Sequence, residues 1–265
     1  MTNHTIDQLL AILDAPTQEG TSGMRTETER RQAAMTLGTL KDPAVVPGIL
    51  QRLRAETPGC GVHETLTWAT VQHIDTALPE VLAMLTDADP HLRRTGAHIL
   101  SKVGDPAHLD ALTPLVADQD VDVALKAYRA VAHAGSEQTE KALDALTGRL
   151  GDGDALQRDA LTAAFHRFGS AAVPALTTAL SDSDAAVREH AADALGHLGE
   201  DAASAVDALA NLANDATQAN DESDAVRLAA VSALGQLGEA ARPALETLSS
   251  ATDPVVSAVA KRFLD

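Results

Sequence analysis

The feature of this chain that most constrains its fold is a block of about thirteen residues that recurs along its length. It reads VREHAADALGHLG at residues 187–199 and VRLAAVSALGQLG at residues 226–238, with weaker copies at residues 30–40, 92–104 and 156–169. An apolar anchor of the block recurs every 29 to 39 residues, at Leu37, Val71, Leu100, Val131, Phe165, Leu195, Leu234 and Leu264. A period in this range is typical of a solenoid, whose units bury their apolar faces only against neighbouring units.

Each recurring unit predicts two helices. In the sixth unit, Val187, Ala191 and Leu195 recur every four residues and mark one face of a helix that ends at Gly199. Segment 171–182 predicts a second helix, with Pro174 near its start, where the missing N–H costs little. Prolines are expected in the same place in three other units, and aspartate-rich turns are expected to cap the next anchor helices: Pro47, Pro79 and Pro243, and the turns 87–90, 118–120, 152–154 and 182–184.

Composition and length agree with an all-α repeat array. The 265-residue chain contains only one Trp, one Tyr and three Phe, too few for a large globular core, whereas stacked helix pairs can be filled by Ala, Leu and Val. We expect an N-terminal capping helix and linker over residues 1–27, with the helix at residues 5–14, and a repeat array over residues 28–265. The acidic stretch 214–224 lengthens one interval to 39 residues and is expected to be an inserted loop.

The prolines, the recurring VRxxAAxALGxLG block and an Asp–Arg spacing of six residues resemble the HEAT repeat, in particular its phycobilisome-lyase HEAT-like variety. The resemblance covers about residues 28–265 and implies a right-handed α-solenoid of about seven helix pairs, with the anchor helices on the concave surface. It also implies a structural ladder between neighbouring repeats, formed by the pairs Asp87 and Arg93, Asp152 and Arg158, Asp182 and Arg188, and Asp221 and Arg227. Other units carry Glu64, Ala124 or Ser257 in place of the arginine, where we expect the ladder to be interrupted.

The formal net charge of −18 argues against several classes of partner. Such a charge repels nucleic acid and anionic lipid, so we expect neither nucleic-acid binding nor membrane binding. The N-terminus lacks the features of a signal peptide, and no apolar run approaches the ~20 residues of a membrane span. Cys60 is the only cysteine, which excludes a disulfide framework and a thiolate metal cluster. These observations favour a soluble, cytoplasmic protein.

One face of the anchor helices is the candidate binding surface. If the anchors are buried, the positions six and two residues before each anchor, and two after it, lie together on another face. In the middle units, cations and histidines occupy these positions, and both amphipathic aromatics lie three residues before their anchors. The residues are Trp68, His73, Arg94, His98, Lys102, Tyr128, Arg129, His133 and Arg167. This pattern predicts a concave strip that binds an acidic or phosphorylated protein partner. The alternative is that Trp68 and Tyr128 fill gaps between repeats and that the charges are merely solvated.

The sequence contains none of the usual catalytic motifs, such as GxSxG, HExxH or a phosphate-cradling glycine loop. HEAT-like iron hydroxylases use repeated His-Glu pairs, and only His63 and Glu64 form one here. We therefore predict no metal, no cofactor and no enzymatic activity, and expect a protein–protein interaction module or scaffold. The alternative is an enzyme or enzyme subunit of the bilin-lyase-like or DNA-glycosylase-like HEAT type.

Overall fold

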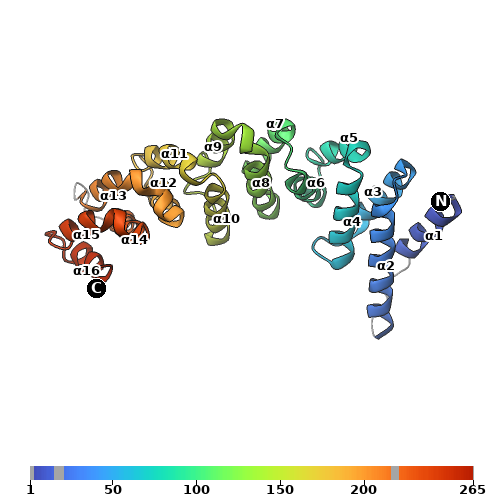
Figure 1. Ribbon diagram of the computed structural model, residues 1–265, viewed down its shortest axis with the longest axis horizontal. Coiled ribbons are helices and arrows are strands. Elements are labelled where there is room, and N and C mark those ends of the chain that lie inside the picture. Colours follow the sequence, from blue (N-terminus) through green and yellow to red (C-terminus); the bar gives the residue numbers. More distant parts are fainter. Residues whose placement is uncertain (1–2, 15–20, 216–220, 265) are drawn as a thin grey trace.

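The computed structural model describes residues 3–14, 21–215 and 221–264, and over these residues all regular structure is helical. The helices form two layers of an elongated arch (Figure 1). The inner, concave layer contains α2 (Thr21–Thr39), α4 (Gly61–Gln72), α6 (Pro90–Val103), α8 (Val121–Ala134), α10 (Ala155–His166), α12 (Ala185–Leu198), α14 (Asp221–Gln236) and α16 (Pro254–Arg262). The outer layer contains α3 (Val46–Ala55), α5 (Ile74–Met84), α7 (Leu109–Leu112), α9 (Thr139–Thr147), α11 (Val173–Ala179), α13 (Val206–Ala213) and α15 (Arg242–Leu248).

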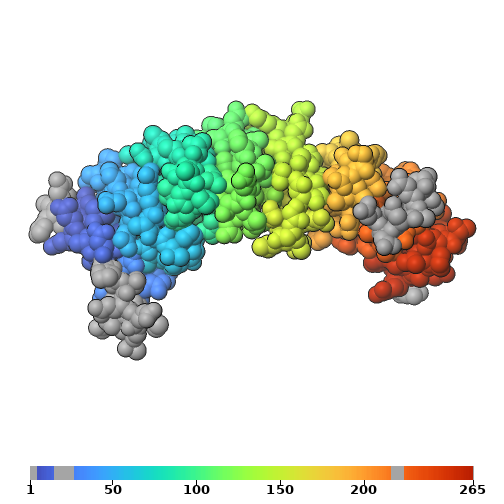
Figure 2. All heavy atoms as spheres, turned by 180° about the vertical axis from the view of Figure 1, so that it is seen from behind, coloured from blue at the N-terminus to red at the C-terminus, as the bar shows by residue number. Residues whose placement is uncertain are grey.

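The units follow one another along the arch in sequence order, so each packs mainly on its neighbours (Figure 2). This arrangement is the α-solenoid predicted from the repeat. The anchors lie where the repeat requires, because those from Leu37 to Leu234 are buried, except Val71, which is partly buried like the terminal Leu264. The core that they form is continuous along the array and consists largely of Ala, Leu and Val.

The predicted helix caps are confirmed at the inner helices. The N-cap residues of α6, α8, α10 and α12 are Asp89, Asp120, Asp154 and Asp184, and each carboxylate accepts a hydrogen bond from a backbone N–H of the first turn. Pro47, Pro174 and Pro243 also lie in the first turn of an outer helix. The prediction is wrong for Pro79, which lies inside α5. The single residue His73 joins α4 to α5, so this outer helix starts closer to its anchor than expected.

Two segment boundaries differ from those expected. The N-terminal helix α1 spans Asn3–Asp14 and packs on α2 and α3. Because α2 begins at Thr21, residues 21–27 are helical and only 15–20 of the expected linker lie outside the described residues. Similarly, residues 221–224 of the expected acidic loop form the first turn of α14, and residues 216–220 lie outside the described residues.

Two arginines of the predicted ladder, Arg93 and Arg227, link neighbouring repeats through a carboxylate of the following turn. Arg93 donates from Nη1 to the main-chain carbonyl of Asp87 (2.9 Å), and from Nε and Nη2 to the carboxylate of Asp118 in the next turn (2.7 and 2.8 Å). Arg227 likewise reaches forward to Asp253 (2.7 Å). Arg93 therefore ties its own turn to the turn that follows, rather than to the carboxylate of Asp87.

At the other two ladder positions, the arginines donate to main-chain carbonyls of the preceding turn. Arg188 donates to the carbonyl of Asp182 (2.8 Å) and Arg158 to that of Gly151 (3.0 Å), while Asp152 pairs with Arg149 instead. The side chain of Asp221 lies outside the described residues. Where Ser257 replaces the arginine, its hydroxyl donates to the carbonyl of Ser249 (2.6 Å), so the turn keeps a partner there. The sequence did not predict the pair between Arg30 and Glu56, both of which are buried.

Over the described ranges, no helix combines the length and the apolar character needed to cross a bilayer.

Candidate functional site

The inner helices α6, α8 and α10 form a groove of about 510 Å³ with a cationic lining. Helix α6 contributes Arg94, and α8 contributes Lys126, Arg129 and His133. Arg167, the C-cap of α10, completes the set. The three residues on α8 are spaced three and four apart, so they lie on one face of that helix. Asp122, Leu125 and small alanines of α10 complete the lining, which leaves the long cationic side chains room to reach a ligand.

The cations of this groove lack acidic partners. No described carboxylate lies within ion-pair distance of Arg94, Lys126, Arg129 or Arg167, and the buried Nε of Arg94 has no hydrogen-bond acceptor. Burial lowers the pKa of Lys126, and Arg94, Arg129 and Lys102 lower it further, with Glu64 opposing them. The site therefore concentrates positive charge that the protein itself does not neutralise.

Burial and the neighbouring cations act on His133 as they do on Lys126. Burial lowers the pKa of its imidazole, and Arg167, Arg129 and Lys102 add to that effect, while a hydrogen bond with the backbone of Ser101 opposes it. An anion in the groove would reverse the Coulombic part of this shift, because it would favour the protonated ring.

Part of the predicted strip thus comes together in one place. Arg94, Arg129, His133 and Arg167 line the groove, and Lys102 is exposed and close enough to influence Lys126 and His133. The prediction missed Lys126, which lies five residues before its anchor and was therefore not among the positions considered. Its spacing of three residues from Arg129 on the same helix indicates that the two cations share a face, and this could have identified Lys126 from the sequence.

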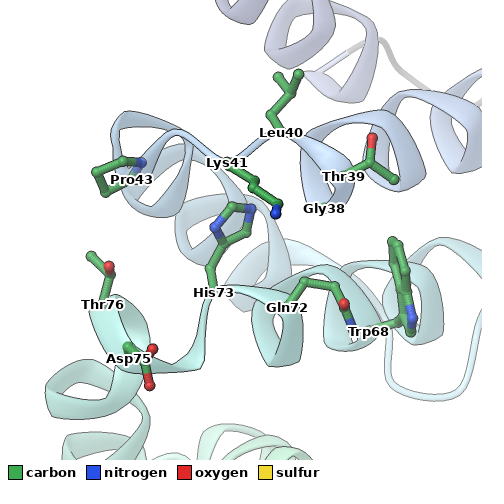
Figure 3. Close-up of a pocket in the computed structure, with 10 residues that line it drawn as sticks. All are labelled: Gly38, Thr39, Leu40, Lys41, Pro43, Trp68, Gln72, His73, Asp75 and Thr76. Atoms are coloured by element: carbon green, nitrogen blue, oxygen red, sulfur yellow. The ribbon is translucent and has the colours of Figure 1, made fainter.

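A second feature surrounds Trp68 on α4. The indole is 40% exposed and borders two hollows, one of about 330 Å³ with Arg31, Met35 and Glu64, the other of about 530 Å³ with Lys41 and His73. Figure 3 shows the larger hollow, with Lys41 and Gln72 between His73 and Trp68. The ring packs on Gly38 of α2 so closely that a Cβ there would lie 2.5 Å from its Cζ3 atom. Glycine at this position therefore allows the ring to lie against α2.

Three residues of the predicted strip are held by the protein itself. Tyr128 is 1% exposed and fills the core, as the alternative interpretation of the aromatics held, so its prediction as a contact residue is wrong. His98 is buried, with its Nε2 at 3.1 Å from a carboxylate oxygen of Glu64 on the neighbouring inner helix. His73 is partly buried, with its Nε2 at 3.1 Å from the carbonyl of Leu37. Position in the repeat does not distinguish Tyr128 from Trp68, which precede their anchors by the same three residues.

The histidines on α4 and α6 are mainly core residues. The rings of His63 and His91 lie with their centroids 5.9 Å apart, and His63 Nε2 lies 3.2 Å from the hydroxyl of Thr95. In the part of the chain that the structure describes, no group of three or more His, Cys, Asp or Glu side chains is placed to hold a metal ion. Glu64, the partner of His63 in the sequence pair, instead contacts His98 most closely.

Comparison with known families confirms the resemblance seen in the sequence. Residues 62–132, 78–165 and 151–219 match the family model for HEAT repeats. Residues 216–241 match a second HEAT-repeat model, and residues 29–55 match the model for the PBS lyase HEAT-like repeat. A search of curated proteins finds no match.

Several solved structures are similar to the whole arch or to most of it. Kap121p bound to the extreme C-terminus of the protein phosphatase Cdc14p matches with a TM-score of 0.61 at 14% identity, over 100% of this chain and 34% of Kap121p. A chain from a structure of microtubule plus-end tracking by XMAP215, CLIP-170 and EB1 has a TM-score of 0.54 at 17% identity, over 71% of this chain and 91% of that one. Human deoxyhypusine hydroxylase has a TM-score of 0.41 at 22% identity, over 99% of this chain and 95% of the hydroxylase. The first two show a common helical-repeat fold, and this chain spans only about a third of Kap121p.

Proposed function

We propose that this chain, which belongs to the family of HEAT-repeat proteins, is a scaffold that binds a partner protein on the concave surface of its arch. The contact surface of the partner is acidic or phosphorylated. The observation that carries this proposal is the groove of α6, α8 and α10, where four cations converge without acidic partners although the protein has a net charge of −18. Forked Arg side chains hold carboxylate and phosphate groups with two hydrogen bonds each.

The overall negative charge does not prevent such binding. At physiological ionic strength, charges separated by more than about 8 Å are largely screened, so the groove acts on a bound group mainly through its own cations. An oxyanion placed there would also relieve the repulsion among these cations. The length of the groove, which crosses three inner helices, favours a segment of chain over a single small ion.

Fold likeness supports a protein as the ligand. Kap121p has been solved bound to Ste12p, to the C-terminus of Cdc14p and to the SUMO protease Ulp1p. In these structures a helical-repeat array serves as the surface for another protein, and we propose the same use of the arch here.

We also propose that the groove binds its ligand without catalysing a reaction. Its lining contains Arg, Lys, Asp, Leu, Ala and His side chains, and no hydroxyl or thiol that His133 could activate as a nucleophile. Binding and release of an anionic segment is therefore the chemistry that these residues support.

A double charge reversal tests the proposed function. Arg129→Glu with Arg167→Glu removes two exposed cations of the groove, and Lys261→Glu with Arg262→Glu makes the same change in net charge at the exposed surface of α16. Binding of fluorescein-labelled Gly/Ser peptides that carry one phosphoserine or a Glu triplet is measured by anisotropy. We expect the groove variant to lose about tenfold or more in affinity and the α16 variant to bind as the wild type does. Equal affinities for the two variants would refute the groove as the binding surface.

A further inference from the structure

We propose that Trp68 and Met35 form a second subsite for the same partner segment, which takes an apolar side chain about five or six residues away from the acidic group in the groove. This inference rests on the proposed function and adds the pattern of the ligand. It divides recognition between an apolar anchor on α2 and α4 and an anion on α6, α8 and α10.

The first observation is an exposed apolar pair on the inner helices. Met35 on α2 is 47% exposed, Trp68 on α4 is 40% exposed, and both line the hollow of about 330 Å³. They belong to a small set of large apolar side chains that the described residues expose, and the rest of that set does not line this hollow. A rigid indole beside a flexible thioether can bind an apolar side chain at a low cost in conformational entropy.

The second observation is that the Trp68 ring is preorganised. Gly38 lies under one edge of the indole, and the ring lines both the hollow with Met35 and the hollow with Lys41 and His73, the second of which is drawn in Figure 3. Lys41 and Arg31, one in each hollow, place a positive charge on both sides of the ring. Each hollow also contains one carboxylate, Glu64 beside Arg31 and Asp75 beside Lys41, so the apolar ring and not net charge is what this subsite offers to a ligand.

The third observation is that Glu64 lies between the two subsites. Its carboxylate lines the Trp68 hollow, contacts His98 on α6 and opposes the lowering of the Lys126 pKa in the groove. Glu64 therefore connects the Trp68 hollow on α4 to His98 on α6, and its negative charge acts on Lys126 of α8. A ligand that spans both subsites should carry uncharged or basic residues at its middle, because an acidic residue there would be repelled by Glu64.

The spacing follows from the stacking of the helices. Helices α4, α6 and α8 pack in that order, and two steps of about 8–10 Å separate the outer pair by about 16–20 Å. An extended chain covers this distance in about five or six residues at roughly 3.3 Å per residue.

The chain's single tryptophan lets the test read the subsite directly. Fluorescein-labelled Gly/Ser peptides carry one phosphoserine and one leucine, with the leucine moved from two to ten positions away on either side. We expect leucine at about five or six positions, on one side only, to tighten binding about fivefold or more over the leucine-free peptide. Unlabelled versions of the same peptides should shift the Trp68 emission to shorter wavelength and protect it from acrylamide.

Variants separate this inference from the proposed function. Trp68→Ala and Met35→Ala should lose the leucine gain and keep the phosphate-dependent affinity. Phe263→Ala is the matched control, because this ring is 43% exposed and packs on Gly235 as Trp68 packs on Gly38. A leucine gain at every spacing, or one that survives both Trp68→Ala and Met35→Ala, overturns the second subsite while the groove stands. If phosphoserine adds no affinity to any peptide, the groove itself fails.

Discussion

Replacing His63 by glutamine is expected to make the region around α4 less sensitive to acid. The wild-type imidazole is fully buried, its Nε2 lies 3.2 Å from the Thr95 hydroxyl, and its Nδ1 has no hydrogen-bond partner among the described residues. Protonation would place a charge at this buried site, where a carboxylate oxygen of Glu64 lies 3.9 Å from Nδ1, beyond hydrogen-bond distance. Glutamine fills a similar position with a polar side chain that does not titrate.

The magnitude follows from the pKa of this histidine. Burial lowers the pKa from 6.5 to about 4, and His91, Arg94 and His98 add to the shift while Glu64 opposes it. Because the unfolded chain then takes up the proton first, stability is lost as the pH falls from about 6.5 towards 4. Between pH 7.5 and pH 5, the linkage relation gives a loss of about 2 kcal/mol from this residue.

Urea unfolding at the two pH values measures this loss. Trp68 lies on the same helix as His63, so its fluorescence reports the unfolding of this region even if the repeats do not unfold together. The wild type should lose about 2 kcal/mol more than His63→Gln between pH 7.5 and pH 5. His166→Gln, at an exposed position of α10, is the control and should behave as the wild type does. Identical losses for wild type and His63→Gln would refute the argument that His63 is held neutral by burial.

Three further changes test the ladder, the seat of the indole and the groove. Arg227→Ala should cost about 1–3 kcal/mol, because this buried guanidinium donates hydrogen bonds to the carbonyl of Ala213 and to the carboxylate of Asp253. Arg242→Ala, at an exposed helix ion pair, should cost a few tenths, and both losses are measured from urea midpoints by circular dichroism. Gly38→Ala should cost about 1–3 kcal/mol and shift the Trp68 emission, because the new methyl would overlap the ring. The wild type should bind the Glu peptide more tightly at pH 6.5 than at pH 7.5, because a bound anion raises the lowered pKa of His133 and so couples binding to proton uptake. His133→Asn should abolish this pH dependence.

For each of these three substitutions, one result would contradict the expected effect. Equal losses for Arg227→Ala and Arg242→Ala would show that the ladder contributes no more than a surface ion pair. An unchanged melting temperature and emission for Gly38→Ala would show that the indole is free to move away from α2. A wild-type affinity that stays constant or falls as the pH is lowered would show that His133 does not sense the ligand.

Local rules and periodicity predicted most of the fold because each unit repeats the same solution. The spacing of the anchors from Leu37 to Leu234 identified the inner helices, and the aspartates before them identified their starts. The errors fall where a unit departs from the average. At α5, the one-residue connection through His73 moves the helix start and places Pro79 inside it. The ladder arginines were found by spacing, but their acceptors depend on how adjacent turns stack, which no local pattern encodes.

The site was predicted less completely, because the position of a residue on a helix determines where its side chain points but not which residues surround that side chain. Arg94, Arg129 and Arg167 lie in the groove that their positions indicated. Trp68 and Tyr128 share a position in the repeat, yet one is exposed and the other is fully enclosed. The difference depends on the residues that the neighbouring repeats bring against each ring, and these lie about thirty residues away in the sequence.

The charge pattern of the inner helices also sets the limits of the binding surface. Arg94 lies six residues before its anchor on α6, and Arg129 lies two residues before its anchor on α8. On α12, Glu189 and Asp193 occupy these two positions. An acidic segment that leaves the groove beyond α10 would therefore meet carboxylates in place of guanidinium groups. A partner bound in the groove is therefore directed towards α4 and Trp68, where the two hollows contain one cation and one carboxylate each: Arg31 with Glu64, and Lys41 with Asp75. The second subsite is thus expected on the N-terminal side of the groove, and the repeats from α12 onwards remain available for a contact of opposite charge.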